Sequence, residues 1–269
     1  MELTALTDFI GPGGIVALTG AGMSTDSGIP DYRGPNARPR KQITFQELIA
    51  SHDAQQRYWA RSFVGFAKFR QAVPNEGHCS LAQLGAAGAI TSVITQNVDN
   101  LHRLAGSDPV IDLHGLISEV VCVSCGTVSA RSDLQNRLQA RNRGFLERHD
   151  GVIAPDGDAD IEDTADFVIV RCLVCGGTLK PNVVLFGENV AKPKVARCFD
   201  LVESAKGLLV LGSSLTVQSG LRFVRRAAKH AIPVAIVNRG KTRGDEFATL
   251  KIEAGLTDIL MELAATTIG

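Results

Sequence analysis

The sequence lacks the features that indicate a membrane span, an export signal or a nucleic-acid partner. Its 269 residues carry 28 Lys and Arg against 28 Asp and Glu, so no net charge attracts nucleic acid or an anionic membrane. No uninterrupted apolar run approaches the length of a membrane span, and residues 1–14 hold none long enough for a signal peptide. We therefore expect a cytoplasmic chain in a reducing compartment, with no nucleic-acid and no membrane partner.

Apolar runs alternate with helix-like stretches, which predicts an α/β fold with a parallel sheet. The expected strands are 15–18, 90–95, 110–113, 183–186, 208–211 and 234–237, and the expected helices are 78–86, 194–205, 220–229 and 258–264. Residues 34–74 interrupt this alternation and hold aromatic residues at helical spacing, which predicts the core of a small helical module. These aromatics are Phe45, Tyr58, Trp59, Phe63, Phe66 and Phe69.

A glycine-rich loop directly follows the first apolar run. Gly20 and Gly22 leave room for backbone N–H groups to close on a diphosphate, and the next helix is expected to point its N-terminus at the anion. The pattern is not a full dinucleotide fingerprint, because Thr25 stands where the third glycine belongs and no ribose-binding acid follows about twenty residues on. A Gly-rich turn that only packs against the sheet is the alternative.

Four of the six cysteines form two pairs with two-residue spacing. These pairs, Cys122 with Cys125 and Cys172 with Cys175, are each followed by glycine, which is typical of the knuckles of a zinc site. Four protein ligands leave no open position for water, so we expect one structural Zn²⁺. The 46 residues between the pairs predict an inserted lobe, and the unpaired Cys79 and Cys198 are expected to be small buried residues.

Polar residues follow four of the expected strands. The carboxyl edge of an open α/β sheet is where ligands bind, so these tips predict one elongated ligand, such as a dinucleotide. His114 stands at one tip beside glycine and is the leading candidate for a general base, although a hydrogen-bonded core histidine is the alternative. The other tip residues are Gln96, Asn97, Asp99, Gly212, Ser213, Ser214, Asn238, Arg239 and Gly240.

Together these segments resemble the sirtuin family of NAD-dependent protein-lysine deacylases. The resemblance spans nearly the whole chain: the loop of residues 20–33, the segment 95–102, residues 113–115, the two cysteine pairs, and residues 181–188 follow in the family's order. Residues 57–61, the long gap between the cysteine pairs and residues 154–158 look most like the class II, mitochondrial-type branch.

The resemblance implies a fold and a domain division. The fold is α/β, with a Rossmann-like parallel sheet, a smaller zinc-binding lobe and a helical module. Residues 1–34, 75–118 and 180–269 are expected to form a discontinuous NAD-binding domain. Residues 35–74 (helical module) and 119–179 (zinc-binding lobe) are expected to form the small domain.

The resemblance also implies a reaction. The oxygen of an acylated lysine in a protein or peptide attacks the ribose carbon of NAD as nicotinamide leaves, and lysine and O-acyl-ADP-ribose follow. Asn97 and Asp99 would hold the nicotinamide, Gln96 would contact the ribose hydroxyls, Arg33 would order the loop over the ribose, and His114 would deprotonate a ribose hydroxyl.

The remaining contacts follow from the same resemblance. A strand of the enzyme is expected to pair with the substrate backbone through Val184, Leu185, Phe186, Gly187 and Glu188. Besides the tip residues, NAD is expected to contact Gly20, Ala21, Gly22, Ser24, Thr25, Ile29, Pro30, Asp31, Tyr32, Arg33 and Leu256.

Two other functions stay open at this point. A mono-ADP-ribosyltransferase would use the same cleavage with another acceptor, and a non-catalytic NAD or ADP-ribose sensor would not need Asn97, Asp99 and His114 together. Tyr58 and Arg61 have the Tyr-x-x-Arg spacing of relatives that prefer succinyl-lysine, yet their surroundings resemble class II. We therefore rank acetyl and larger uncharged acyl groups above succinyl.

Overall fold

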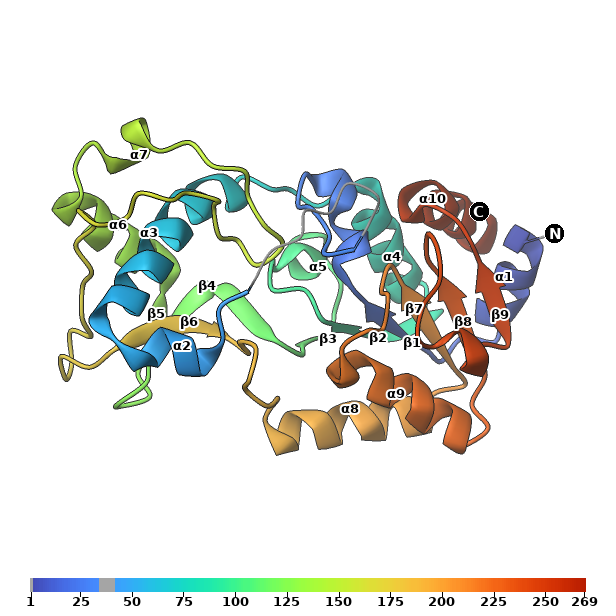
Figure 1. Ribbon diagram of the computed structural model, residues 1–269. Helices are drawn as coiled ribbons and strands as arrows, with labels where there is room; N and C mark the ends of the chain where they lie inside the picture. The colour runs from blue at the N-terminus through green and yellow to red at the C-terminus, as the bar shows by residue number, and fades with distance from the viewer. Residues whose placement is uncertain (1, 34–41) are drawn as a thin grey trace.

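A parallel sheet of six strands forms the larger part of the molecule (Figure 1). The computed structural model describes residues 2–33 and 42–269. The strands are β1 (Ile15–Thr19), β2 (Ile90–Thr95), β3 (Val110–Asp112), β7 (Gly207–Leu211), β8 (Val234–Val237) and β9 (Leu250–Ile252). Their order, β3-β2-β1-β7-β8-β9, reverses direction between β1 and β7, which is the doubly wound arrangement of Rossmann-like folds. The predicted α/β fold is confirmed.

Helices cover both faces of this sheet, which explains why its central strands are apolar throughout. On one face lie α1 (Glu2–Ile10), α4 (Glu76–Ala86) and α10 (Leu256–Ile268), and on the other lie α8 (Lys192–Ser204) and α9 (Gln218–Lys229). Side chains alternate between the two cores along β1: Ile15 and Ala17 belong to the first, Val16 and Leu18 to the second.

A smaller lobe is built on an antiparallel sheet of three strands. Its strands, in the order β5-β4-β6, are β4 (Gly115–Cys122), β5 (Val128–Ala130) and β6 (Leu179–Val183). Helices α2 (Phe45–Ala50), α3 (His52–Phe69), α6 (Arg131–Arg141) and α7 (Phe145–Arg148) pack with it around a separate core. The predicted aromatic module is confirmed in α3, where Tyr58, Trp59, Phe63, Phe66 and Phe69 are buried, whereas Phe45 is partly exposed. Residues 34–41, where this module was expected to begin, lie outside the described residues.

Local capping explains where two helices begin. The Thr44 side chain accepts from the Glu47 N–H while Glu47 accepts from the Thr44 N–H, which starts α2. Asn75 and His78 make the same reciprocal pair at the start of α4. His78 of this second capping box is fully buried, and its ring lies 4.8 Å from the ring of His102.

The strand expected over residues 183–186 is wrong beyond Val183. These residues do not join the parallel sheet: β6 ends at Val183, and the chain then turns. The Glu188 carboxylate accepts the N–H of Leu185, and Gly187 sits at φ 85°, so the segment closes on itself. An apolar run followed by a left-handed glycine therefore forms a turn, although its composition matches a buried strand.

Cys198 is buried as expected, but Cys79 is only partly buried on α4. Across the described residues, no helix combines the length and the apolar character that crossing a membrane demands.

Candidate active site

A cleft of about 960 Å³ is lined by residues at the carboxyl ends of the large sheet's strands and by residues of the small lobe. Its walls come from the loop after β1, from the tips of β2, β3, β7 and β8, and from the segment that joins β6 to α8. Because these segments are far apart in the sequence, the topology of the doubly wound sheet assembles the site.

The glycine loop packs tightly against the loop after β7. A Cβ on Gly20 would lie 2.8 Å from the Gly212 carbonyl oxygen, and one on Gly22 would lie 2.9 Å from the Gly212 Cα. Gly212 itself has a φ of 59°. Only glycine at these positions lets the two backbones approach so closely.

The expected helix does not follow the glycine loop. Two short 3-10 turns follow instead, η1 (Ala21–Met23) and η2 (Thr25–Ser27), because Gly28 at φ 83° ends the second turn. The N–H groups of Ala21 and Thr25 donate to no acceptor in the part of the chain that the structure describes. Two unpaired backbone donors at the mouth of the loop fit the oxygens of a diphosphate.

Ser24 connects the glycine loop to the tip of β2. Asn97 donates from Nδ2 to the Gly20 carbonyl oxygen at 3.0 Å and to the Ser24 Oγ at 3.0 Å. The Ser24 hydroxyl in turn donates to Asp99 at 2.7 Å, whose second oxygen accepts from the Leu101 N–H. Burial raises the pKa of Asp99, and these two donors oppose the shift. The amide and the carboxyl group are thus held in fixed positions before any ligand binds.

His114 follows β3 and has a partner on each ring nitrogen. Its Nδ1 lies 2.8 Å from the Gln96 carbonyl oxygen, and its Nε2 lies 2.8 Å from the Ser219 Oγ. A carbonyl oxygen only accepts, so Nδ1 carries the hydrogen of the neutral ring and Nε2 accepts from Ser219.

Burial lowers the pKa of His114, and the positive charges of Lys194 and Arg222 lower it further. The imidazole is therefore held in the neutral form that accepts a proton.

The structure brings the predicted cofactor and catalytic residues to this cleft, with one exception. The cleft is lined by the candidates from the glycine loop and from the tips of β2, β3, β7 and β8, together with Leu256 at the start of α10. Gly240 is not among the lining residues. Gln96 also lines the cleft, and its Nε2 donates to the Ser213 Oγ at 2.8 Å.

The predicted substrate segment, residues 184–188, also lines the cleft. The Val184 N–H donates to the His114 carbonyl oxygen at 2.8 Å, and the Phe186 carbonyl oxygen accepts from the Phe45 N–H at 2.9 Å. An ion pair between Lys180 and Glu188 at 2.8 Å fixes the base of the turn.

Several lining residues were missed by sequence reasoning. Ser219 lies at the start of α9, five residues after the Ser214 tip, and a polar residue so close to a predicted tip was the available signal. Tyr58, Asp156 and Asp158 come from the small lobe. No sequence signal placed Asp156 and Asp158 there, because the approach of their loop to α3 depends on Gly65, where a Cβ would lie 2.1 Å from the carbonyl oxygen of Gly157.

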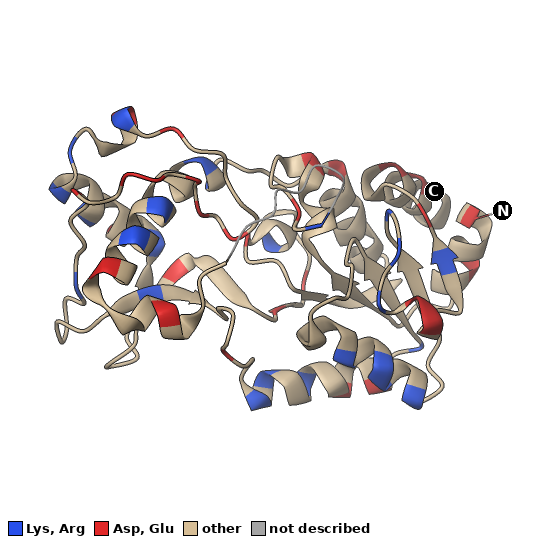
Figure 2. Cartoon of the chain, viewed as in Figure 1, with Lys and Arg blue, Asp and Glu red and all other residues tan. Residues whose placement is uncertain are grey.

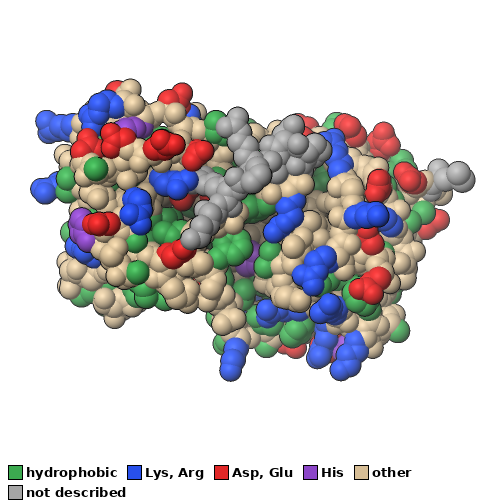
Figure 3. Space-filling model, viewed as in Figure 1, with side chains coloured by type: hydrophobic (Ala, Val, Ile, Leu, Met, Phe, Trp, Pro, Cys, Tyr) green, Lys and Arg blue, Asp and Glu red, His purple; other side chains and the backbone are tan. Residues whose placement is uncertain are grey.

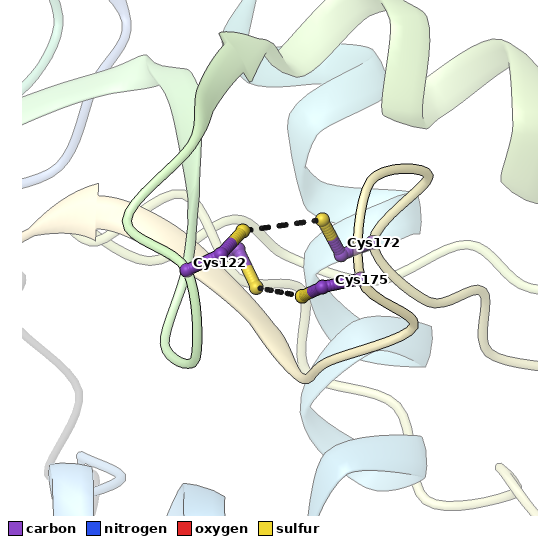
Figure 4. Close-up of side chains that lie close together, drawn as sticks. Cys122, Cys172 and Cys175 are labelled. Carbon is purple, nitrogen blue, oxygen red and sulfur yellow. Dashed lines mark hydrogen bonds between the residues drawn. The ribbon is translucent and has the colours of Figure 1, made fainter.

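The four paired cysteines meet where β4 ends and just before β6 begins (Figure 4). Their sulfur atoms lie within 4.8 Å of one another, and the contacts across the knuckles are 3.5 Å for Cys122–Cys175 and 3.8 Å for Cys125–Cys172. Zn–S bonds of about 2.3 Å in a tetrahedron place sulfurs about 3.8 Å apart, so the cluster fits one zinc ion. The backbone N–H of Cys125 lowers the pKa of Cys122, which favours the thiolate.

Comparison with known proteins gives matches over the whole chain. Residues 20–219 match the protein family described as Sir2. "NAD-dependent protein deacetylase 1" of Streptomyces coelicolor is 51% identical over 267 residues, covering 98% of this chain and 89% of that protein. "NAD-dependent protein deacylase SIR4" of Monosiga brevicollis is 45% identical over 237 residues, covering 86% and 77% respectively.

Solved structures also match this chain over nearly its full length. A complex described as "Sir2-p53 peptide-NAD+" has a TM-score of 0.79 at 31% identity and covers 99% of this chain and 98% of its own. A Sir2 structure bound to a propionylated peptide has a TM-score of 0.79 at 30% identity, with the same coverage. The similarity therefore includes both sheets and the cleft between them.

Proposed function

Because this chain belongs to the Sir2 family, we propose that it is an NAD-dependent protein-lysine deacylase. In this reaction NAD, water and an acylated lysine of a protein or peptide give nicotinamide, O-acyl-ADP-ribose and free lysine. NAD lies along the glycine loop and the strand tips, and the acyl-lysine side chain enters beside residues 184–188. Zinc has a structural role, because all four positions of its site are filled by cysteine.

The observation that carries this proposal is a neutral imidazole facing the same cleft as a fixed amide and carboxyl group. Asn97 uses both N–H groups of its side chain on Gly20 and Ser24, which leaves its Oδ1 without a donor in the described part of the chain. That oxygen and the Asp99 carboxyl group suit the N–H groups of a carboxamide such as nicotinamide.

His114 supplies the proton transfer. When a ribose hydroxyl reaches Nε2, the neutral ring takes its proton, and the Gln96 carbonyl oxygen stabilises the resulting imidazolium through Nδ1–H. The hydroxyl oxygen is then free to attack the carbon of the activated acyl group. A base positioned in this way contributes roughly 10²- to 10⁴-fold to the rate.

The test is to mix the purified protein with NAD and an acetyl-lysine peptide and to follow all products by mass spectrometry. We expect free nicotinamide, a peptide that has lost its acyl group, and O-acyl-ADP-ribose. His114→Ala should keep the fold and lose at least roughly 10²-fold in turnover. A gain of mass on a protein acceptor would instead indicate an ADP-ribosyltransferase, and NAD binding without turnover would indicate a sensor; either result contradicts the proposal.

The acyl group is proposed to be uncharged. Tyr58 lines the cleft, but Arg61 does not. The Arg61 guanidinium donates to the Ala159 carbonyl oxygen at 3.2 Å and to Asp160 at 3.3 Å. The Arg61 guanidinium, which would have to pair with a succinyl carboxylate, is thus already hydrogen-bonded to residues 159 and 160 of the small lobe.

A panel of peptides that differ only in the acyl group measures this preference. We expect acetyl-, propionyl- and longer uncharged acyl-lysine to have the higher kcat/KM, and succinyl-lysine the lower. Arg61→Lys should leave this order unchanged. A higher kcat/KM for succinyl-lysine, lost on that substitution, would contradict the assignment.

A further inference from the structure

The zero net charge conceals a strong separation of charge along the chain. Residues 192–243 contain eleven Lys and Arg but only two acids, Asp200 and Glu203. The rest of the chain therefore has nine more acids than bases. An asymmetry of this size creates a local field that the total charge does not report.

Most of these cations lie on two neighbouring helices. α8 and α9 pack side by side through the rings of Phe199 and Phe223, whose centroids are 5.4 Å apart. Lys and Arg residues recur along both helices and on the loop after β8 (Figure 2), and several of them are exposed. We call the Lys and Arg side chains of α8, α9 and residues 239–243 the basic face. In the space-filling view they gather at the lower right (Figure 3).

The basic face is largely uncompensated. Within the described residues, the only ion pair on it joins Arg226 to Glu203. Lys192, Arg197, Arg225 and Lys229 are exposed and have no carboxylate partner among the described residues. Such cations attract an anionic partner over a distance set by ionic strength, about 8 Å at physiological salt.

The basic face is continuous with the proposed active site. Arg222, Arg239 and Lys241 belong both to it and to the wall of the cleft. The proposed substrate segment, residues 184–188, leads within four residues to the start of α8 at Lys192. A polypeptide whose acyl-lysine occupies the cleft would therefore have its flanking residues beside these cations.

The face does not offer the second feature of a nucleic-acid site, which is a row of exposed aromatic rings for base stacking. Phe223 is fully buried and Phe199 packs against it and beneath Arg226, at 5.0 Å. Residues 192–243 contain no Phe, Tyr or Trp other than these two.

We propose that the basic face is a docking surface for substrate proteins that present their acyl-lysine within an acidic surface. This inference rests on the proposed deacylase function and adds the substrate class to it. Attraction between the acidic surface and the basic face raises the rate of encounter and orients the lysine toward the cleft.

The experiment compares three acetyl-lysine peptides that are identical except for the arms on both sides of the lysine, which are acidic, neutral or basic. We measure kcat/KM at low and high salt. Independently of turnover, we measure binding of the labelled peptides by fluorescence anisotropy without NAD. We expect the acidic peptide to exceed the basic one by about tenfold or more at low salt, and the difference to fall as salt screens the charges.

The variant Arg225→Glu/Lys229→Glu reverses two exposed charges outside the cleft. It should remove or invert the preference for acidic arms and leave kcat/KM for the neutral peptide unchanged. Arg225→Gln/Lys229→Gln should weaken the preference without adding acids to the helix. The matched control, Arg141→Glu/Arg143→Glu, makes the same change in net charge at exposed positions of the small lobe and should keep the preference.

Equal binding of the three peptides, or a preference that the α9 variants leave intact, overturns the docking surface. Salt-sensitive binding of an oligonucleotide that the α9 variants abolish, with no preference among the peptides, assigns the face to nucleic acid instead. Failure of the neutral peptide to react contradicts the deacylase function alone, because the anisotropy measurement still tests the docking surface.

Discussion

At the scale of single residues, the site depends on side chains that hold one another in place. His114 was predictable because a lone histidine stands at a strand tip next to glycine. Its partner Ser219 was missed although it lies five residues after the predicted tip residue Ser214, because a serine at a helix start has many ordinary roles. Sequence therefore predicted the groups proposed to do the chemistry, and the structure supplied the groups that orient them.

Ser219→Ala removes the hydrogen bond to the nitrogen that we assign as the base. A hydrogen bond of about 1 kcal/mol predicts a fall in kcat of roughly fivefold. The wild-type acidic limb of the pH–rate profile should lie below pH 6.5, because the lowered pKa keeps His114 neutral to lower pH. A hydroxyl that donates to Nε2 favours the neutral ring, so its loss should move the limb to higher pH.

The control for this prediction is Ser204→Ala at the end of α8, whose hydroxyl bonds only backbone carbonyls of its own helix. It should leave both kcat and the pH profile as in the wild type. If Ser219→Ala has an unmoved acidic limb and a wild-type kcat, Ser219 does not position the base.

At the scale of elements, hydrophobic pattern predicted those strands that helices bury on both faces. The runs at β1, β7 and β8 are mostly apolar because every residue in them is buried, and in β2 only Thr91 is exposed. β9 was missed because it is three residues long and contains a lysine, and β4 because its burial is interrupted along its length. The turn at residues 184–188 shows the converse error, since one left-handed glycine outweighs four apolar neighbours.

The close contact between the glycine loop after β1 and the loop after β7 leads to a prediction for NAD binding. Gly22→Ala places a methyl group 2.9 Å from the Gly212 Cα and 3.0 Å from its carbonyl oxygen, and neither backbone atom can yield like a side chain. We expect a KM for NAD raised by roughly tenfold and a free energy of unfolding reduced by about 1–3 kcal/mol.

Gly85→Ala is the matched control, since the new methyl group on α4 would have its nearest neighbour at 3.7 Å. It should keep the wild-type KM and gain up to about 1 kcal/mol from helix propensity. A wild-type KM for NAD in Gly22→Ala would show that the two loops tolerate separation.

The cysteine knuckles predict one zinc per chain. Cys122→Ser removes a buried thiolate from the cluster, and metal analysis should then find well under one equivalent, together with a lower melting temperature. Zinc-site free energies of about 10–16 kcal/mol in small peptides indicate how strongly the lobe depends on the ion. Cys79→Ser, outside the cluster, should retain one equivalent; full zinc in Cys122→Ser would contradict a site of four thiolates.

At the scale of the whole molecule, the sequence predicted the α/β class and the additional lobes, and it contains the excess of Lys and Arg in residues 192–243, but it does not show which side of the molecule these cations occupy. Equal totals of acids and bases suggested that no field acts on partners, whereas folding gathers the cations of α8, α9 and residues 239–243 on one side. The division into domains at residues 34, 75, 118 and 180 stays a prediction, as does the cytoplasmic location. β4 spans residues 115–122, so one strand continues through the predicted boundary at 118.

Two buried histidines behind the strand tips make the stability of the whole fold depend on pH. Burial lowers the pKa of His78 to about 4 and that of His102 to about 3, from an ordinary value of 6.5. Below pH 6.5 these two histidines thus bind protons in the unfolded chain but stay neutral in the folded chain. Stability is complete above pH 6.5 and is lost as the pH falls toward 4, by about 1.5 kcal/mol per histidine between pH 6.5 and 5.

His78→Gln tests this linkage, because glutamine does not titrate and still suits the third position of a capping box. Urea unfolding at pH 6.5 and pH 5 should show a loss smaller by about 1.5 kcal/mol than in the wild type. The exposed His52 provides the control His52→Gln, which should behave as the wild type. All three proteins share the zinc site, so an identical pH dependence in His78→Gln would contradict the role of His78.

The hydrogen bond from the Val184 N–H to the His114 carbonyl oxygen has a consequence for motion. It couples the main chain beside the proposed peptide-binding segment to the main chain of the proposed base. If the lobes tilt relative to each other, these two parts travel together, and the distance between substrate backbone and imidazole is conserved. We then expect adjustment during turnover on the side of the proposed dinucleotide site, at the glycine loop.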